Sequence, residues 1–302
     1  MPNEMIKWGF YIYLAIIPLI PDEINSKYRL TDIYFMLLVF SYLVNMLTNS
    51  YRREKLLNDM KMFFKDYIVI FMILLMVVMG ISILYSTDKS IAIQETIRFG
   101  TYIGVLYYFI SEVDIKKEFN RIIKFIYYPS FLVGIIGIFQ AITKKGITVY
   151  SNDIGRISST LGNPNSLGVY FVILIFPLIT IIFFEKNVLS KRIYSVFSIV
   201  MILNIVFSFS RNAWLSLVIG LCIFAIVYNW KCIIGIFIAV GGALLYQPLN
   251  ERLIGISKSV MNDGRLKHWG VALEMFKDKP INGVGNGNYV TLHSKYLESF
   301  PQ

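Results

Sequence analysis

The 302-residue sequence has few charged residues and few side chains of the kinds that bind metals or form disulfides. Asp, Glu, Lys and Arg together make up 16% of it, whereas 56% is hydrophobic. This balance excludes an ordinary soluble globular domain and favours an all-α, polytopic membrane protein. The chain has only two cysteines, Cys222 and Cys232, too far apart for Cys-x-x-Cys chemistry. Buried structural thiols are therefore a better interpretation than a disulfide framework or a zinc site.

Metal ligands and cofactor motifs are also scarce. No Asp-x-Asp pair occurs, and no metal-ligand spacing joins His268 to His293, so the sequence predicts neither a metal site nor a cofactor. The formal net charge of +10 would suggest a nucleic-acid partner in a soluble protein. In a membrane protein this charge belongs mainly to the loops, and we expect no nucleic-acid partner.

Long apolar segments divide most of the chain into candidate membrane-spanning helices. A span needs about 20 mostly apolar residues, and lipid offers no partners for unpaired backbone groups. The first segment lacks the charged leader and small-residue cleavage site of a signal peptide, so we expect it to be retained. The sequence predicts nine spans: Trp8–Ile20, Thr31–Thr48, Tyr67–Tyr85, Ile91–Ser111, Ile122–Ile142, Ser166–Phe184, Tyr194–Phe209, Ala213–Tyr228 and Cys232–Tyr246.

The distribution of positive charge predicts how the spans are oriented. With a cytoplasmic N-terminus, the inner connections hold about twice as many Lys and Arg residues as the short outer ones. We therefore expect a multi-pass protein of the cell membrane with its N-terminus inside. Residues 1–246 are predicted to form a transmembrane helical domain, and residues 247–302 an extracytoplasmic segment. The basic connection Tyr51–Lys65 is either an amphipathic helix on the inner leaflet or a solvated loop.

Three polar elements place an arginine at or near the predicted outer face. They are Gly155–Asn165 with Arg156, Ser208–Trp214 with Arg211, and the tail segment Asp263–Trp269 with Arg265. An arginine at a bilayer boundary is costly unless a partner, a cavity or snorkelling satisfies it. Because a guanidinium donates two parallel hydrogen bonds to phosphate, this convergence suggests an anionic ligand. A solvated loop position would explain Arg156 equally well.

Several other polar residues have simpler structural interpretations. Arg98 lies three residues after Glu95, and a local ion pair explains it. Asn165 or Ser166 is predicted to cap the sixth span. The glycine-rich segment Gly283–Asn288 follows no strand and precedes no long apolar helix, so a flexible turn is favoured over a phosphate loop.

The segment Gly264–Lys277 has the apolar periodicity of an amphipathic helix. On such a helix His268 shares a face with Arg265, three residues earlier. His268 is either a general base or an interfacial side chain, and the second interpretation is favoured.

The three arginine elements, in this order and followed by Gly283–Tyr289, resemble the O-antigen ligase and O-antigen polymerase superfamily of bacterial envelope enzymes. The resemblance extends from about Arg98 to the end of the chain. It implies metal-independent, inverting transfer of a glycan from a polyprenyl (undecaprenyl) diphosphate to a hydroxyl of a glycan, lipid or protein acceptor at the outer face. Under this resemblance Arg211 and Arg265 bind the diphosphate, and Arg156 is a looser match.

One feature implied by the resemblance is missing. The family carries a histidine in a His-Asn pair soon after the glycine turn, and His293 does not match it in spacing or context. Either the sequence is a fragment or its base is another residue, and we expect a fragment that is inactive by itself. A transporter or flippase for a lipid-linked oligosaccharide is the alternative, although no inverted repeat supports it. The sequence does not choose between ligase and polymerase.

Overall fold

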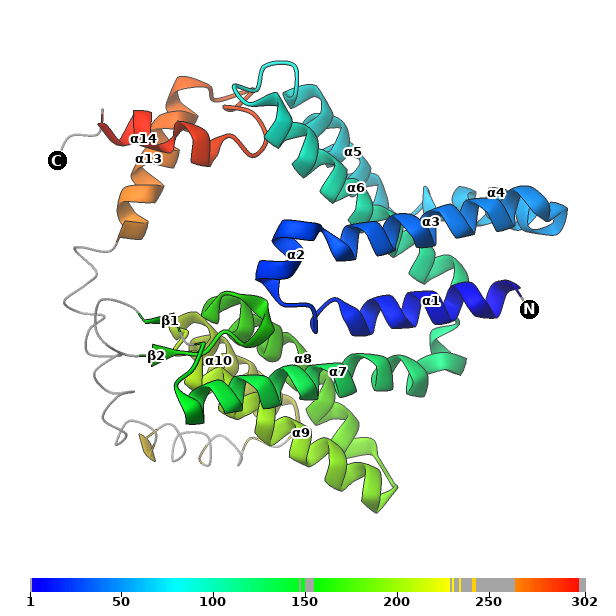
Figure 1. Cartoon of the computed structure of the whole chain (residues 1–302), viewed down its shortest axis with the longest axis vertical. Coiled ribbons are helices and arrows are strands. Elements are labelled where there is room, and N and C mark those ends of the chain that lie inside the picture. The colour runs from blue at the N-terminus through cyan, green and yellow to red at the C-terminus, as the bar shows by residue number, and fades with distance from the viewer. Residues whose placement is uncertain are drawn as a thin grey trace. The chain divides into compact units, whose positions relative to one another are not determined.

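A computed structural model of the chain describes residues 2–146, 148–149, 155–228, 230, 234, 241–242 and 264–298. Side chains are described for these residues except 2–3, 50–53, 148–149 and 264–265. The predicted all-α class is confirmed, because helices dominate and the only sheet in these residues has two strands of two residues each. The main elements are α1 (Pro2–Ile16), α2 (Asp22–Tyr28), α3 (Leu30–Thr48), α4 (Ser50–Phe63), α5 (Tyr67–Ser82), α6 (Lys89–Glu112), α7 (Ile115–Thr143), β1 (Thr148–Val149), β2 (Gly155–Arg156), η1 (Ser159–Leu161), α8 (Pro164–Phe184), α9 (Val188–Phe207), α10 (Arg211–Tyr228), α13 (Gly264–Asp278) and α14 (Tyr289–Glu298) (Figure 1).

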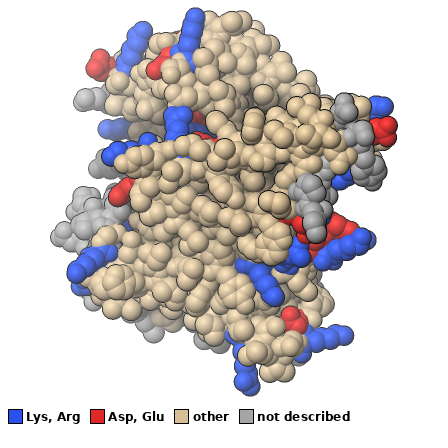
Figure 2. All heavy atoms as spheres, turned by 45° about the vertical axis from the view of Figure 1, so that its right-hand side comes forward, with Lys and Arg blue, Asp and Glu red and all other residues tan. Residues whose placement is uncertain are grey.

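Five helices of the described residues are long and apolar enough to cross a membrane. They are α3, α7, α8, α9 and α10, and the number rises to six if the bent pair Glu54–Phe63 and Tyr67–Ser82 is one broken span. Figure 2 shows broad surface areas without charged side chains, as lipid contact requires. The chain is thus a multi-pass membrane protein.

The predicted set of nine spans is larger than this. Segment Trp8–Ile20 is divided between α1 and the turn that follows it, while Tyr67–Tyr85 contains the shorter α5. Segment Ile91–Ser111 lies within α6, which is not among the five. Most of 232–246 lies outside the described residues. The ninefold crossing, the cytoplasmic N-terminus and the domain boundary at 246 stay predictions.

The chain forms two compact units. Unit 1 contains Met1–Tyr42 and Lys116–Ser257, and unit 2 contains Leu43–Ile115 and Lys258–Gln302. The tail helices α13 and α14 therefore belong to the same unit as α4, α5 and α6.

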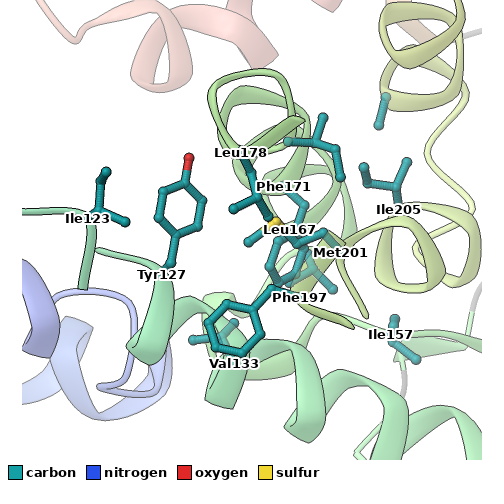
Figure 3. Close-up of a cluster of buried hydrophobic side chains, with 12 residues drawn as sticks. Ile123, Tyr127, Val133, Ile157, Leu167, Phe171, Leu178, Phe197, Met201 and Ile205 are labelled. Carbon is teal, nitrogen blue, oxygen red and sulfur yellow. The ribbon is translucent and has the colours of Figure 1, made fainter. Parts of the chain in front are cut away.

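The core of unit 1 lies where α7, α8 and α9 pack together (Figure 3). Phe171 and Leu178 of α8, Met201 and Ile205 of α9 and Val133 of α7 are fully buried there. At Gly137 of α7 an added Cβ would overlap the side chain of Asn204, so close helix packing requires glycine at this position.

A charged cluster joins the first helix of unit 1 to α7. Glu118 accepts hydrogen bonds from Lys7 Nζ at 2.8 Å, from the Tyr11 hydroxyl and from Arg121 NH1 at 3.2 Å. The Arg121 guanidinium also lies over the Trp8 ring, 5.0 Å from its centroid. The carboxylate is thus held between two cations, which fixes the start of α7 against α1.

Candidate functional site

Arg156 joins the first two arginine elements of unit 1. It ends strand β2 and is 4% exposed. Its Nε donates to the carbonyl oxygen of Ser208 at 2.8 Å, and its NH2 donates to Oδ1 of Asn165 at 2.8 Å. A solvated Arg156 is therefore the wrong alternative, since the loop folds back between α8 and α9. The guanidinium connects the start of α8 to the end of α9.

Close backbone packing brings the same two elements together. The Ile157 amide donates to the Phe207 carbonyl at 3.4 Å. On α8, a Cβ added to Gly168 would lie 2.7 Å from Ala213 Cβ and 3.1 Å from Ser208 Oγ. The start of α8 and the start of α10 thus approach each other more closely than larger side chains would allow.

The structure corrects the predicted cap of the sixth span. Helix α8 begins at Pro164, and its N-cap is Asn163, whose side chain accepts from the Asn165 amide at 2.8 Å. The expectation that Asn165 or Ser166 caps the helix was wrong. A proline suits the first helical position, because its fixed φ is helical and its missing N–H would have no partner within the helix.

Arg211 is the first residue of α10 and is half-buried. The turn before it contains Phe209 with a φ of +48° and Ser210, which is 1% exposed. Trp214, one turn into the helix, donates from Nε1 to the Ile205 carbonyl at 2.9 Å. These contacts fix the direction in which α10 leaves the turn.

Two long helices therefore present their N-termini side by side, with a cationic side chain at one of them. The N-terminal end of a helix carries about half a positive elementary charge and unpaired N–H groups. The ends of α8 and α10 add their fields, and Arg211 contributes a full charge. This arrangement is suited to an anion such as a phosphate group.

The loop that carries Arg156 is held from behind by α7. Oε1 of Gln140 accepts from the backbone amides of Ser158, at 3.2 Å, and Ser159, at 2.8 Å. Oγ of Ser159 donates to the Val133 carbonyl at 2.6 Å, and Oγ1 of Thr160 donates to the Pro18 carbonyl at 2.6 Å. Sequence reasoning had no signal that selected Gln140, because its partners lie 18 and 19 residues away.

In unit 2, the predicted amphipathic helix at Gly264–Lys277 is confirmed as α13. Arg265 is its second residue, and its side chain lies outside the described part. His268 Nδ1 lies 2.6 Å from Nε2 of His293 on α14, so one ring donates a hydrogen bond to the other. The tyrosine hydroxyl of Tyr289 donates to the His268 carbonyl at 2.9 Å. The structure thus brings together the two histidines that sequence reasoning treated separately.

A shallow pocket of about 500 Å³ lies beside the histidine pair. It is lined by His268, Trp269, Ala272, Tyr289, Val290 and His293. Elsewhere between α13 and α14, the Tyr296 hydroxyl donates to Asp278 at 2.8 Å, and this bond raises the pKa of Tyr296. The pocket combines aromatic walls with two imidazoles, which can exchange protons with a bound hydroxyl.

The glycine-rich turn after α13 is packed against the α5–α6 connection. Asn288 is fully buried, and its Oδ1 accepts from the Asp88 amide at 2.6 Å. The Asn286 amide donates to Ser82 Oγ at 3.1 Å, and the Tyr85 hydroxyl donates to the Asn282 carbonyl at 2.6 Å. The predicted turn is confirmed, and its glycines make room for this contact.

Two further expectations concern charge. The ion pair of Arg98 with Glu95 is confirmed, with NH1 and Oε1 2.8 Å apart. In the part of the chain that the structure describes, no three His, Cys, Asp or Glu side chains gather into a possible metal site. Metal independence stays a prediction.

Comparisons with known proteins found two overlapping similarities. Residues 196–301 match the family model described as O-Antigen ligase. The chain is 25% identical over 301 residues to the ComP-specific O-oligosaccharyltransferase of Acinetobacter baylyi (strain ATCC 33305 / BD413 / ADP1), an alignment that covers 94% of this chain and 53% of that protein. The chain thus spans about half the length of this curated relative. No solved structure matches. The family match over residues 196–301 and this relative both support a relationship of the chain to the O-antigen ligase superfamily.

Proposed function

We propose that the chain serves as a membrane glycosyltransferase of the ligase or polymerase type. It would move a glycan from a polyprenyl diphosphate to a hydroxyl of a glycan, lipid or protein acceptor at the outer face. The observation that carries this proposal is the pairing of the α8 and α10 N-termini beside Arg211. The family match over residues 196–301 supports the same reaction class.

The diphosphate is the part of the donor that these groups suit. Arg211 and Arg265 are proposed to bind it, each through two parallel guanidinium hydrogen bonds. Arg156 is the third candidate, and its bonds to Ser208 and Asn165 give it a supporting role. It holds the two helix N-termini at a fixed separation, so their fields act on the same anion.

The proposed step is a single displacement that inverts the sugar. The acceptor oxygen attacks the anomeric carbon on the face opposite the diphosphate, and the carbon–oxygen bond to the diphosphate breaks. The bonding electron pair leaves with the polyprenyl diphosphate, and the acceptor's proton passes to a base. Fixed cations at a low-dielectric boundary stabilise the charge that develops on the leaving group, so neither a nucleotide sugar nor a metal is required.

As the base that accepts the proton of the acceptor hydroxyl, we propose the histidine pair of unit 2. In a neutral pair, one outer ring nitrogen has a free lone pair that can accept the hydroxyl proton. The bond between His268 and His293 orients both rings, and Tyr289 supplies a wall on which an acceptor can pack. His268 thereby becomes a stronger candidate than its sequence context indicated.

Binding of the donor headgroup tests the proposal without depending on turnover. The chain in detergent or nanodiscs is titrated with undecaprenyl diphosphate and, separately, with uncharged undecaprenol. We expect Arg211→Ala and Arg265→Ala each to weaken diphosphate binding about 10- to 100-fold, the equivalent of one lost charged hydrogen-bonding group. Binding of the uncharged lipid should not change.

Arg192→Ala is the matched control, because it removes an exposed arginine from the predicted inner connection. If both site variants bound the diphosphate as tightly as this control, the assignment of the two arginines would be refuted. Movement of a lipid-linked glycan across vesicles without transfer would instead support the flippase alternative.

A further inference from the structure

Helix α13 carries two apolar faces, and the described residues of its unit cover only one of them. Val271 and Met275 are buried, at 0% and 3% exposure, on a helix that packs against α14. A second set, which we name the exposed stripe, consists of Leu266, Trp269, Leu273 and Phe276. The spacing of these residues puts them on one side of the helix over three turns, opposite Val271 and Met275.

The members of the exposed stripe are large and well exposed. Trp269 is 72% exposed, Phe276 59%, Leu273 53% and Leu266 50%. Single apolar residues on a surface need no explanation, but a continuous row of four marks a contact site. Lys277 lies beside the row, and Lys279 follows the helix. An apolar face bordered by lysines and containing tryptophan is typical of a helix that lies in a membrane interface.

The attachment of α13 to the rest of unit 2 indicates what the stripe meets. The glycine turn bonds to Ser82, Tyr85 and Asp88, at the end of the very apolar helix α5. Ile81 and Leu84 near this end are 54% and 77% exposed, as lipid-facing residues are. Ile281, next to the Asn282 that Tyr85 holds, is 94% exposed. The segment that carries the stripe is thus attached at the end of α5, beside these exposed apolar residues, and Figure 1 shows α13 and α14 joined to the rest of unit 2 at this end.

We propose that α13 lies on the lipid surface, with the exposed stripe in the boundary between headgroups and acyl chains. The leaflet is the one that meets the α5–α6 turn. Helix α14 covers the opposite side of α13, and the neighbouring lysines meet anionic headgroups. The glycine turn sets the depth, because it ties α13 to the end of a membrane helix. This inference does not depend on the proposed function.

Spin labels at neighbouring positions of α13 test the proposal. In a chain with Cys222→Ala and Cys232→Ala, labels are attached through Leu273→Cys and Phe276→Cys on the stripe, and through Lys267→Cys and Glu274→Cys outside it. The protein is placed in nanodiscs of phosphatidylcholine and phosphatidylglycerol. Collision of each label with oxygen, which enters lipid, is compared with collision with a water-soluble nickel chelate.

We expect the two stripe positions to favour oxygen and the two other positions to favour the nickel chelate. Equal preferences at all four positions would overturn the proposal, as would stripe labels that neither reagent reaches, because another protein surface would then cover them.

A second measurement uses the native tryptophan and needs no label. The emission of the unlabelled chain minus that of a Trp269→Phe variant isolates Trp269. We expect lipids brominated near the top of the acyl chain to quench this difference signal, more strongly than lipids brominated near the chain end. A difference signal that brominated lipids leave unchanged would contradict lipid contact.

Discussion

The glycine turn of unit 2 offers a test in which backbone strain and docking can be separated. Three of its glycines have positive φ values: +65° at Gly283, +98° at Gly285 and +72° at Gly287. An added Cβ would meet nothing within 4 Å at Gly283. At Gly285 it would lie 2.9 Å from the Ser86 Cα, and at Gly287 2.6 Å from Cγ2 of Ile91. Alanine substitutions at these three positions should therefore destabilise the docked turn by different amounts.

The expected magnitudes follow from two terms. A left-handed conformation costs a residue with a Cβ about 1–2 kcal/mol, which is the whole expected effect of Gly283→Ala. Gly287→Ala adds a contact that the flexible Ile91 side chain can relieve. Gly285→Ala adds overlap with backbone, for which about 1–3 kcal/mol more is expected, and its φ is less favourable for alanine. The predicted loss of stability is thus smallest for Gly283→Ala, larger for Gly287→Ala and largest for Gly285→Ala.

Hydrogen exchange of the α5–α6 connection measures this order directly. The Asp88 amide donates to the buried Asn288 side chain, so its protection reports whether the turn is docked. Each loss of about 1.4 kcal/mol should lower the protection tenfold. Amides of α8 and α9 in unit 1 serve as an internal reference. If Gly283→Ala lowered Asp88 protection as much as Gly285→Ala, the turn's own conformation and not its contact with Ser86 would decide the cost.

Two further predictions concern charged residues of unit 1. Arg156→Lys should lower the free energy of unfolding in detergent by about 1–3 kcal/mol, because a lysine ammonium cannot donate to both the Ser208 carbonyl and Asn165 as the guanidinium does. An unchanged melting temperature would contradict the bridging role. Glu118→Gln should lower the free energy of unfolding by about 2 kcal/mol, since it leaves Lys7 and Arg121 facing a neutral amide. This value is smaller than for a fully buried pair, because the two cations are partly exposed to solvent. Adding Lys7→Met should recover part of that loss, and a double variant no more stable than the single one would argue against charge as the cause.

Local patterns were sufficient for several features. Helix α13 was located from its apolar periodicity, and the Arg98–Glu95 pair from a three-residue spacing, because both depend on neighbours within one helix. The cap of α8 was misplaced by two residues or more, since Asn163, Asn165 and Ser166 are all good capping residues, and the proline at 164 decides among them.

Local sequence patterns did not predict the contacts between distant segments. Arg156 could be solvated or buried until the loop was seen to fold onto Ser208 and Asn165. His268 and His293 are 25 positions apart, and only the packing of α14 on α13 joins them. The Gly283–Asn288 turn was predicted from composition, but its docking on Ser82 and Asp88 depends on residues some 200 positions earlier.

The amino-acid sequence alone indicates a helical membrane protein that carries three arginine elements in a defined order. Hydrophobicity and residue order determine these features, and neither requires knowledge of distant contacts. The tertiary structure alone decided that Arg156 is a buried bridge, that Arg211 opens a helix beside a second helix N-terminus, and that the tail is fastened to α5 and α6. The physical reason is that buried polar groups must find partners, and those partners are chosen by the packing of helices far apart in the chain.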